Sequence, residues 1–312
     1  MAMKRCLYTI ILLVCAIVPM ASPVHSSSTT IIAIMSSDQQ RYRDAHRAFV
    51  TSLADQGYKV PSTEIVLHTP AADPLSLAAE LRKLHGSRPD LIVTYGAPAA
   101  LAAVRDAAGI PVLSVDVFAP DQALKGVCGV SSRVSMVTLL KTLLAIRPCQ
   151  RIGVLYSPRE FGSQQQLDDV KKFAATLGVT VLEGNVPAAA ALDTELNKLL
   201  DKCEAVVVTE GGLLGPQFER IIAKSKARRI PVASTMPDAA DKGAVVSLEI
   251  NPQEQGYLAA EMAVRILEGA KTEFLPLVRS HRIDLVINVR QAHEMGIDVP
   301  VTVQRGATRV IK

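Results

Sequence analysis

The sequence predicts an α/β protein with two doubly wound parallel-sheet lobes that are joined by a multi-strand hinge. Short apolar runs, as expected of strands buried on both faces, alternate with helical segments along the chain. The alternation stops at Pro148 and restarts at residue 151, and the Ile-Pro-Val strand start at residues 110–112 recurs at residues 230–232. A further helix and strand follow two complete halves, so we expect the chain to cross back between the lobes.

In the first half, turn and cap residues separate the elements. Gly57 and Gly109 end helices, Pro98 suits a first helical turn, and Asp73-Pro74 opens a helix. The expected strands are residues 31–35, 64–69, 91–93 and 110–115, with an extended piece at 128–131, and the expected helices are residues 41–57, 74–85 and 99–108.

The second half follows the same rules, with Pro148 and Gly178 ending helices. The expected strands are residues 151–156, 179–182, 205–209, 230–234, 244–250 and 283–288, and the expected helices are residues 135–146, 163–177, 193–201, one ending near 228, 253–267 and 290–295.

The amino terminus has the pattern of an export signal. Lys4 and Arg5 precede an apolar run at residues 7–18 and a small-residue stretch that ends near Ser26. We expect cleavage after Ser26, with Ala21 as the second choice, and a periplasmic or otherwise exported protein. The apolar run is shorter than the roughly 20 residues that a spanning helix needs.

Composition excludes several classes of function. The formal net charge of +4 falls by two when Lys4 and Arg5 leave, so no basic footprint for nucleic acid remains. Three cysteines lie beyond the signal, Cys128, Cys149 and Cys203, with no C-x-x-C pair. They allow one disulfide or free thiols, and we expect no metal site and no cofactor.

Several short motifs occur together in one order. They are residues 88–93 with 98–100, residues 110–112 leading to Asp116, residues 151–158 with Glu160 and Ser163, residues 242–244, Gly256 ahead of 266–269, and residues 287–288 ahead of Ala292 and 295–297. With these motifs the chain resembles the substrate-binding proteins of ABC transporters that include tryptophan- and tyrosine-binding members. The resemblance spans nearly the whole chain beyond the signal. The chain departs from the family at Val117, where Pro is usual, and at Glu210, where the turn usually holds Asp.

The resemblance implies a type I periplasmic-binding-protein fold with interlobe crossings near Ser131, Ile250 and Leu277. Lobe 1 then comprises residues 29–131 and 251–277, and lobe 2 comprises residues 132–250 and 278–312. The implied function is capture of a small ligand between the lobes for the permease of an ABC importer. We expect a monomer that meets the membrane only through that permease and is not an enzyme.

Ligand contacts are expected at the turns that follow the strands, because open α/β sheets bind ligands there. Hydroxyls and helix-start N–H groups suit a carboxylate, and acidic side chains suit an ammonium group. An amino acid or a related small organic anion or zwitterion fits both. The candidate ligand-binding residues are Ser36, Ser37, Gln39, Thr94, Tyr95, Gly96, Ala97, Asp116, Tyr156, Ser157, Glu160, Ser163, Glu210, Gly211 and Thr235. Within this set, residues 94–97 are the first candidate for the anion-contacting edge.

Other interpretations remain open. Helix capping is the alternative role for the Ser and Thr residues, and core packing is the alternative for Tyr95 and Tyr156, which otherwise sandwich an apolar part of the ligand. A sensor that signals to a membrane partner would have the same fold. A hydrolase or racemase that uses Asp116 with Glu210 is the enzyme alternative, although no G-x-S-x-G, H-E-x-x-H or P-loop motif is present.

Overall fold

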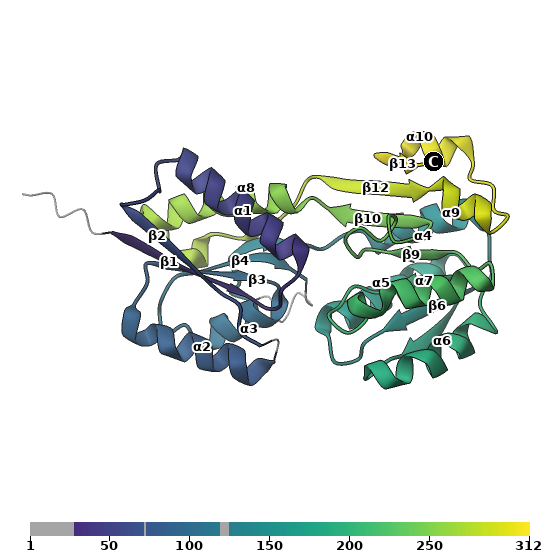
Figure 1. The fold of residues 1–312 in the computed structure, drawn as a ribbon, viewed down its shortest axis with the longest axis horizontal. Coiled ribbons are helices and arrows are strands. Elements are labelled where there is room, and N and C mark those ends of the chain that lie inside the picture. The colour runs from purple at the N-terminus through teal and green to yellow at the C-terminus, as the bar shows by residue number, and fades with distance from the viewer. Residues whose placement is uncertain (1–27, 72, 119–124) are drawn as a thin grey trace, which may run out of the picture.

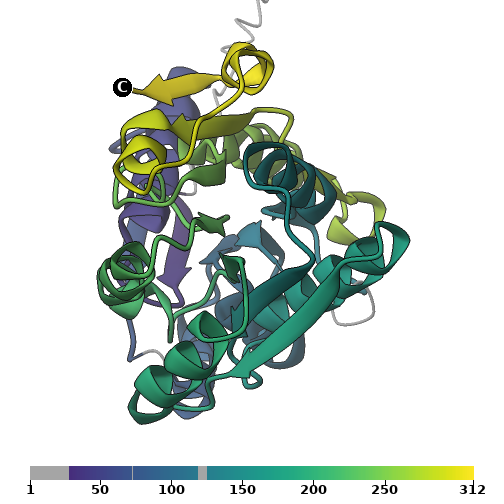
Figure 2. The ribbon, with the colours of Figure 1, turned by 90° about the vertical axis from the view of Figure 1, so that its right-hand side faces the viewer.

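The computed structural model describes residues 28–71, 73–118 and 125–312, and the expected signal segment at residues 1–26 lies outside them. Two lobes lie side by side along the longest axis of the molecule (Figure 1). Each lobe is a sheet with helices on both faces, and Figure 2 shows the second lobe end-on. The predicted two-lobed α/β fold is therefore confirmed. Within the described ranges, none of the helices combines the length and apolar character that crossing a membrane requires.

The first lobe holds a six-stranded sheet in the order β11-β5-β4-β3-β1-β2, and its strand pairs are parallel. Its elements are β1 (Thr29–Met35), α1 (Gln40–Asp55), β2 (Thr63–His68), α2 (Pro74–Ser87), β3 (Leu91–Tyr95), α3 (Ala97–Asp106), β4 (Val112–Val117), β5 (Gly129–Ser131), α8 (Pro252–Leu267), the 3₁₀ turn Thr272–Phe274 and β11 (Leu277–Arg279).

Alternating side chains of β1 explain the two layers of this lobe. Ile31 and Met35 point to one face and pack with α1 and α8. Ile32 and Ile34 point to the other face and pack with α2 and α3. Both faces are apolar because helices cover both, which is why the strand reads as a continuous apolar run.

The second lobe holds a seven-stranded sheet in the order β13-β12-β10-β9-β8-β6-β7. Its elements are α4 (Met136–Ile146), β6 (Arg151–Tyr156), α5 (Phe161–Thr176), β7 (Thr180–Asn185), the 3₁₀ turn Ala189–Ala191, α6 (Leu192–Leu200), β8 (Ala205–Val208), the 3₁₀ turn Gly215–Gln217, α7 (Phe218–Ala227), β9 (Val232–Ser234), β10 (Val246–Ile250), β12 (Ile283–Asn288), α9 (Val289–Glu294), α10 (Val301–Gly306) and β13 (Arg309–Ile311).

The same alternation divides the core of the second lobe. Ala205 and Val207 of β8 pack with α4, α5 and α9, whereas Val206 and Val208 pack with α6 and α7. Each of the four apolar clusters thus lies within one lobe.

The chain changes sheet three times. It leaves the first sheet after β5, returns after β10, and leaves again after β11. Strand β11 pairs with β5 as far as Arg279, so the first lobe extends two residues past the expected boundary at residue 277. Strand β12 therefore enters the second lobe beside the departing β10, and the two pair antiparallel. The expectation of purely parallel sheets is wrong at this one pair. Strand β13 and helix α10 were not predicted, because residues 297–312 carry no strong apolar period.

Cys128, Cys149 and Cys203 are free thiols. Burial is the main cause that raises the pKa of each to about 11, so all three remain protonated at neutral pH. They are placed to pack, and not to react.

Helices α1 and α8 pack closely against one another, although nearly two hundred residues separate them along the chain (Figure 1). Gly256 of α8 makes this possible, since a Cβ there would collide with the backbone oxygen of Ala45 and crowd Ala48. We predict that Gly256→Ala destabilises the protein by about 1–3 kcal/mol through overpacking. Thermal or urea denaturation measures the change.

Gly86→Ala is the matched control, because Gly86 lies in α2 and a Cβ there meets nothing within 4 Å. It should stabilise the protein by about 0.5–1 kcal/mol, the usual gain for alanine over glycine in a helix. Equal effects of the two variants would contradict the close approach of α1 and α8.

Candidate ligand-binding site

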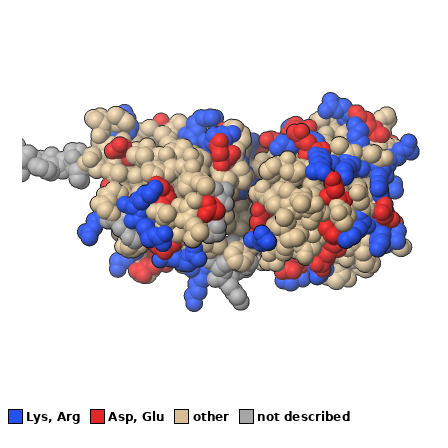
Figure 3. Space-filling view, turned by 60° about the horizontal axis from the view of Figure 1, so that its bottom comes forward, with Lys and Arg blue, Asp and Glu red and all other residues tan. Residues whose placement is uncertain are grey.

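A cleft lies between the lobes, and Figure 3 shows it as a groove that separates the two masses. Two adjoining cavities of about 390 Å³ and 740 Å³ lie in it, and residues of both lobes line each cavity. The cavities share Arg41, Glu160 and Glu210 in their walls, so they are parts of one cleft. Many of the lining residues come from turns after parallel strands, as expected for an α/β sheet.

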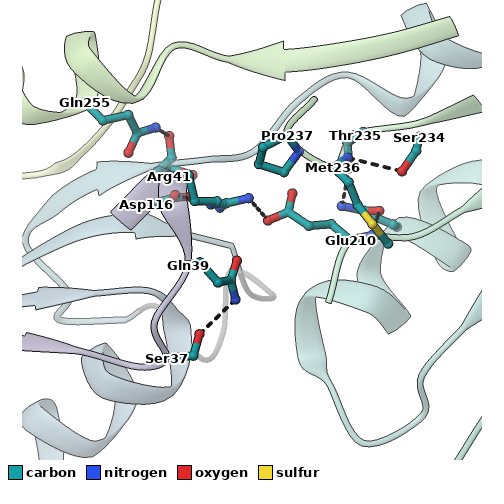
Figure 4. Close-up of polar contacts among 12 residues, drawn as sticks. Ser37, Gln39, Arg41, Asp116, Glu210, Ser234, Thr235, Met236, Pro237 and Gln255 are labelled. Carbon is teal, nitrogen blue, oxygen red and sulfur yellow. Dashed lines mark hydrogen bonds and ion pairs between the residues drawn. The ribbon is translucent and has the colours of Figure 1, made fainter. Parts of the chain in front are cut away.

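The centre of the cleft is a guanidinium held by two carboxylates. Arg41, in the first turn of α1, donates from Nε and Nη2 to both oxygens of Asp116 at the end of β4. Its Nη1 donates to Glu210, which follows β8 in the other lobe. Figure 4 shows Arg41 reaching across the gap to Glu210. Arg41 is only 9% exposed and Asp116 only 6%, so this cluster is shielded from water.

Backbone geometry aims Asp116 at Arg41. The pairing of β4 with β5 shifts register between Ser114 and Val117, and Asp116 adopts a positive φ of 57°. A register shift of this kind re-aims a side chain, and Asp tolerates the left-handed region better than most residues. The carboxylate therefore meets the side-on fork of the guanidinium and fixes its orientation within the first lobe.

Charge and burial compete in this cluster. Burial alone would lower the pKa of Arg41, but the negative charges of Asp116 and Glu210 outweigh burial and raise that pKa above its ordinary value. Burial raises the pKa of Glu210 to about 7, despite the opposing effect of Arg41. The ring of Tyr42 lies beside the guanidinium, 5.4 Å from its centroid to Arg41 Cζ, and adds a cation–π contact.

Gln166 of α5 holds the second-lobe side of the cluster in place. Its Oε1 accepts a hydrogen bond from the backbone N–H of Glu210 (2.9 Å), and its Nε2 donates to Thr235 Oγ1 (3.0 Å). Gln166 is 1% exposed, so its amide is committed to these two partners. It fixes the turn after β8 relative to the turn after β9.

Glu160, the N-cap residue of α5, supplies a carboxylate with spare capacity. Its Oε1 accepts from the backbone N–H of Leu213 (3.0 Å). Its Oε2 is buried and has no hydrogen-bond partner among the described residues. A Cβ at Gly211 would collide with that oxygen, so glycine is required for the carboxylate to lie against this turn. Burial raises the pKa of Glu160 above its ordinary value.

Most predicted site residues line the cleft. The walls of the two cavities include Ser36, Ser37, Gln39, Ala97, Asp116, Ser157, Glu160, Ser163, Glu210 and Gly211, and Thr235 lines a small neighbouring cavity beside Arg41.

Two of these hydroxyls are already used to build the turns. Ser36 Oγ donates to Tyr95 O (2.7 Å) and accepts from Ala99 N–H (2.9 Å) at the start of α3. Ser163 Oγ accepts from Ser157 N–H (2.8 Å). The capping role therefore applies to Ser36 at the start of α3, whereas Ser163 ties α5 to the turn after β6.

Four predicted residues do not line the cavities. Thr94 Oγ1 donates to Ser114 Oγ (2.9 Å) inside the sheet. Tyr95 and Tyr156 pack in the cores of their lobes, so the packing alternative describes them and they do not face one another. Gly96 adopts a φ of 89°, where a Cβ would collide with the hydroxyl of Tyr42. Of the first-candidate stretch 94–97, only Ala97 reaches the cavity wall.

The smaller cavity has apolar residues in its wall as well as the charged residues of the ion cluster. Leu77, Leu101 and Ala102 line it from the first lobe, and Phe161 lines it from α5. Phe161 is 55% exposed, which is unusual for a phenylalanine unless something covers it. A wall that combines apolar and charged groups suits an amphiphilic small molecule.

Sequence reasoning missed Arg41 and Gln166. Arg41 stands in an amphipathic helix where a charged residue normally faces water, and its partners lie 75 and 169 residues away. Gln166 left a local signal, because Ser163, Gln166, Leu167 and Val170 form one buried helical stripe. A polar residue within an apolar stripe points to a buried hydrogen bond.

A group of three acidic residues lies at the edge of the cleft, with Asp238 in the wall of the larger cavity. Asp238, Asp241 and Glu249 place carboxylate oxygens within 4.8 Å of one another. Arg309 donates to both oxygens of Asp241 at 2.8 and 2.6 Å, so this group is an ion-pair cluster beside β13.

Comparisons with known proteins identify chains of similar sequence and of the same fold. A curated relative, the tyrosine-binding protein of Clostridioides difficile (strain R20291), is 24% identical over 255 residues, which are 78% of this chain and 74% of the relative. An ABC domain from Streptococcus pneumonia in complex with L-Trp superimposes with a TM-score of 0.84 at 24% identity, covering 91% of this chain and 100% of that one. A ligand-free, open substrate-binding protein from Clostridium difficile gives 0.73 at 24% identity, covering 91% and 99%.

The family model for ABC transporter substrate binding proteins matches residues 29–311, which is nearly all of the described chain. This chain belongs to the family of ABC transporter substrate-binding proteins.

Proposed function

We propose that this protein is exported, captures an amino acid between its two lobes, and delivers the ligand-bound form to the permease of an ABC importer. Membership of the substrate-binding family supports the transport role. The basic and apolar residues at positions 4–18 support export. Ligand contacts from both lobes would favour the closed arrangement over the open one.

The observation that carries the ligand class is the carboxylate of Glu160. Glu160 lines both cavities, and its Oε2 is buried without a hydrogen-bond partner among the described residues. A buried charged acceptor is costly unless something pairs with it. An ammonium group of the ligand would supply that partner, and a zwitterion would bring a carboxylate with it.

The apolar residues in the wall of the smaller cavity support an amino acid with an apolar or aromatic side chain. Leu101, Ala102 and Phe161 offer a surface of the right character. The relatives agree with this class, since one is a tyrosine-binding protein and another was crystallised with L-Trp.

Acid–base catalysis is disfavoured by the same geometry. A hydrolase or racemase would use Asp116 and Glu210 as its acid and base, but both accept hydrogen bonds from Arg41. Both oxygens of Asp116 already accept hydrogen bonds from Arg41, so that carboxylate is committed to the ion pair.

A thermal-shift panel of the twenty common L-amino acids tests the proposal. We expect at least one to raise the melting temperature by about 5–10 °C at a hundredfold excess over its Kd. Glu160→Gln should weaken its binding by about tenfold to a hundredfold, the range for a charged hydrogen bond. Glu219→Gln is the control, because Glu219 is exposed and lines neither cavity, and it should change nothing. Chemical conversion of the bound compound would overturn the binding role.

Gly211 gives a second test of the Glu160 carboxylate. Gly211→Ala should push that carboxylate off the turn and weaken binding of the same amino acid by about tenfold or more, since the collision is with the acceptor itself. Gly306→Ala is the control, because Gly306 lines neither cavity and a Cβ there meets nothing within 4 Å. Isothermal titration calorimetry measures both, and similar Kd values for the two variants would contradict this role of the turn.

Binding should also depend on pH. Lowering the pH protonates Glu160 and removes the charge that attracts the ammonium group. Because burial raises the pKa of Glu160 above 4.5, the affinity should begin to fall at a higher pH than for an exposed glutamate. Calorimetric titrations between pH 4 and 8 measure this fall, and Glu160→Gln should abolish it. A wild-type profile that matches Glu160→Gln would exclude Glu160 as the titrating group.

A further inference from the structure

Arg41 is a cation held in place by the first lobe alone. The two-point contact with Asp116 uses Nε and Nη2, and both residues belong to that lobe. Parting of the lobes would leave this contact intact. The contact of Nη1 with Glu210 is different, because it is the ion pair that joins the lobes among the described residues.

We propose that Arg41 receives the carboxylate of the ligand, and that Glu210 occupies the same position on Arg41 in the ligand-free protein. The proposal rests on the amino-acid ligand proposed above. Glu210 is then an internal competitor of the ligand and a latch between the lobes.

The expected anion site at the start of α3 has few donors to offer. Ala99 N–H donates to Ser36 Oγ, Gly96 N–H donates to Val115 O, and Pro98 has no N–H. Arg41 is the buried guanidinium of the cavity walls, whereas Arg105 and Arg159 in the same walls are exposed. A ligand carboxylate thus finds its strongest shielded partner at Arg41.

Charge balance requires an exchange rather than an addition. Arg41 already faces two carboxylates, and a third would place like charges together in a shielded site. Glu210 is the carboxylate able to leave, because it has one contact with Arg41, belongs to the other lobe and is 19% exposed. Its raised pKa agrees with this, since its charge is costly where it lies.

The exchange makes a zwitterion the ligand that closes the cleft. Its carboxylate would replace Glu210 on Arg41 in the first lobe, and its ammonium would pair with Glu160 in the second lobe. An amine without a carboxylate leaves Glu210 in place and gains one contact only. The carboxylate and the ammonium of the ligand, and the distance between them, therefore determine which ligands the cleft selects.

The test compares L-tryptophan and L-tyrosine with tryptamine and tyramine, which lack the carboxylate, by calorimetry. Glu210→Gln should lower the Kd of the amino acids by about fivefold to tenfold by removing the competitor. Arg41→Gln should raise it by about thirtyfold or more while changing the amine affinity less than about threefold. Arg47→Gln, an exposed arginine on the same helix, should change neither. A higher amino-acid Kd in Glu210→Gln, or no change, would overturn the proposal.

Small-angle X-ray scattering of the ligand-free wild type and of Glu210→Gln tests the latch without any ligand. The Glu210→Gln variant should fold, because Arg41 remains paired with Asp116. Its radius of gyration should exceed that of the wild type and of Arg47→Gln. An unchanged radius would overturn the latch. Failure of every amino acid to bind the wild type would instead overturn the ligand class, and with it the assignment of Arg41 to the ligand's carboxylate.

Discussion

The guanidinium of Arg41 is buried and must be paired with opposite charges, and this need determines how the cleft is built. A buried charge is tolerated only when it is paired and hydrogen-bonded, and Arg41 meets that condition with carboxylates from two lobes. The requirement ties together α1, the register shift at the end of β4 and the turn after β8, which are far apart in the sequence. Local geometry that looks strained, such as the positive φ of Asp116, is explained by this single contact.

The two lobes contribute different chemistry to the same space. The first lobe supplies the fixed cation and most of the apolar wall, and the second lobe supplies movable or under-used carboxylates at Glu160 and Glu210. Gln166 and the glycine turn at Gly211 support those carboxylates without reaching far into the cavity. A molecule that satisfies both lobes must therefore carry groups of opposite charge and an apolar part.

Much of this arrangement can be read from the sequence, and the remainder has an identifiable cause. Apolar runs separated by cap residues predicted the two-lobed fold, because their period is local. Strand ends located Asp116, Glu160 and Glu210 at the cleft, since parallel strands end at one edge of a sheet. The same rule also selected Thr94, which alternation turns into the sheet interior. Arg41 could not be found this way, because its role exists only once distant carboxylates surround it.

Each of the four apolar clusters is complete within its own lobe. Rotation of one lobe against the other therefore exposes none of the packed core to water, and the large hydrophobic contribution to folding is the same in every lobe arrangement. The free-energy difference between arrangements reduces to a few polar contacts in the cleft. Such a difference is small enough for one small molecule to reverse, which lets a stable protein respond to a weak signal.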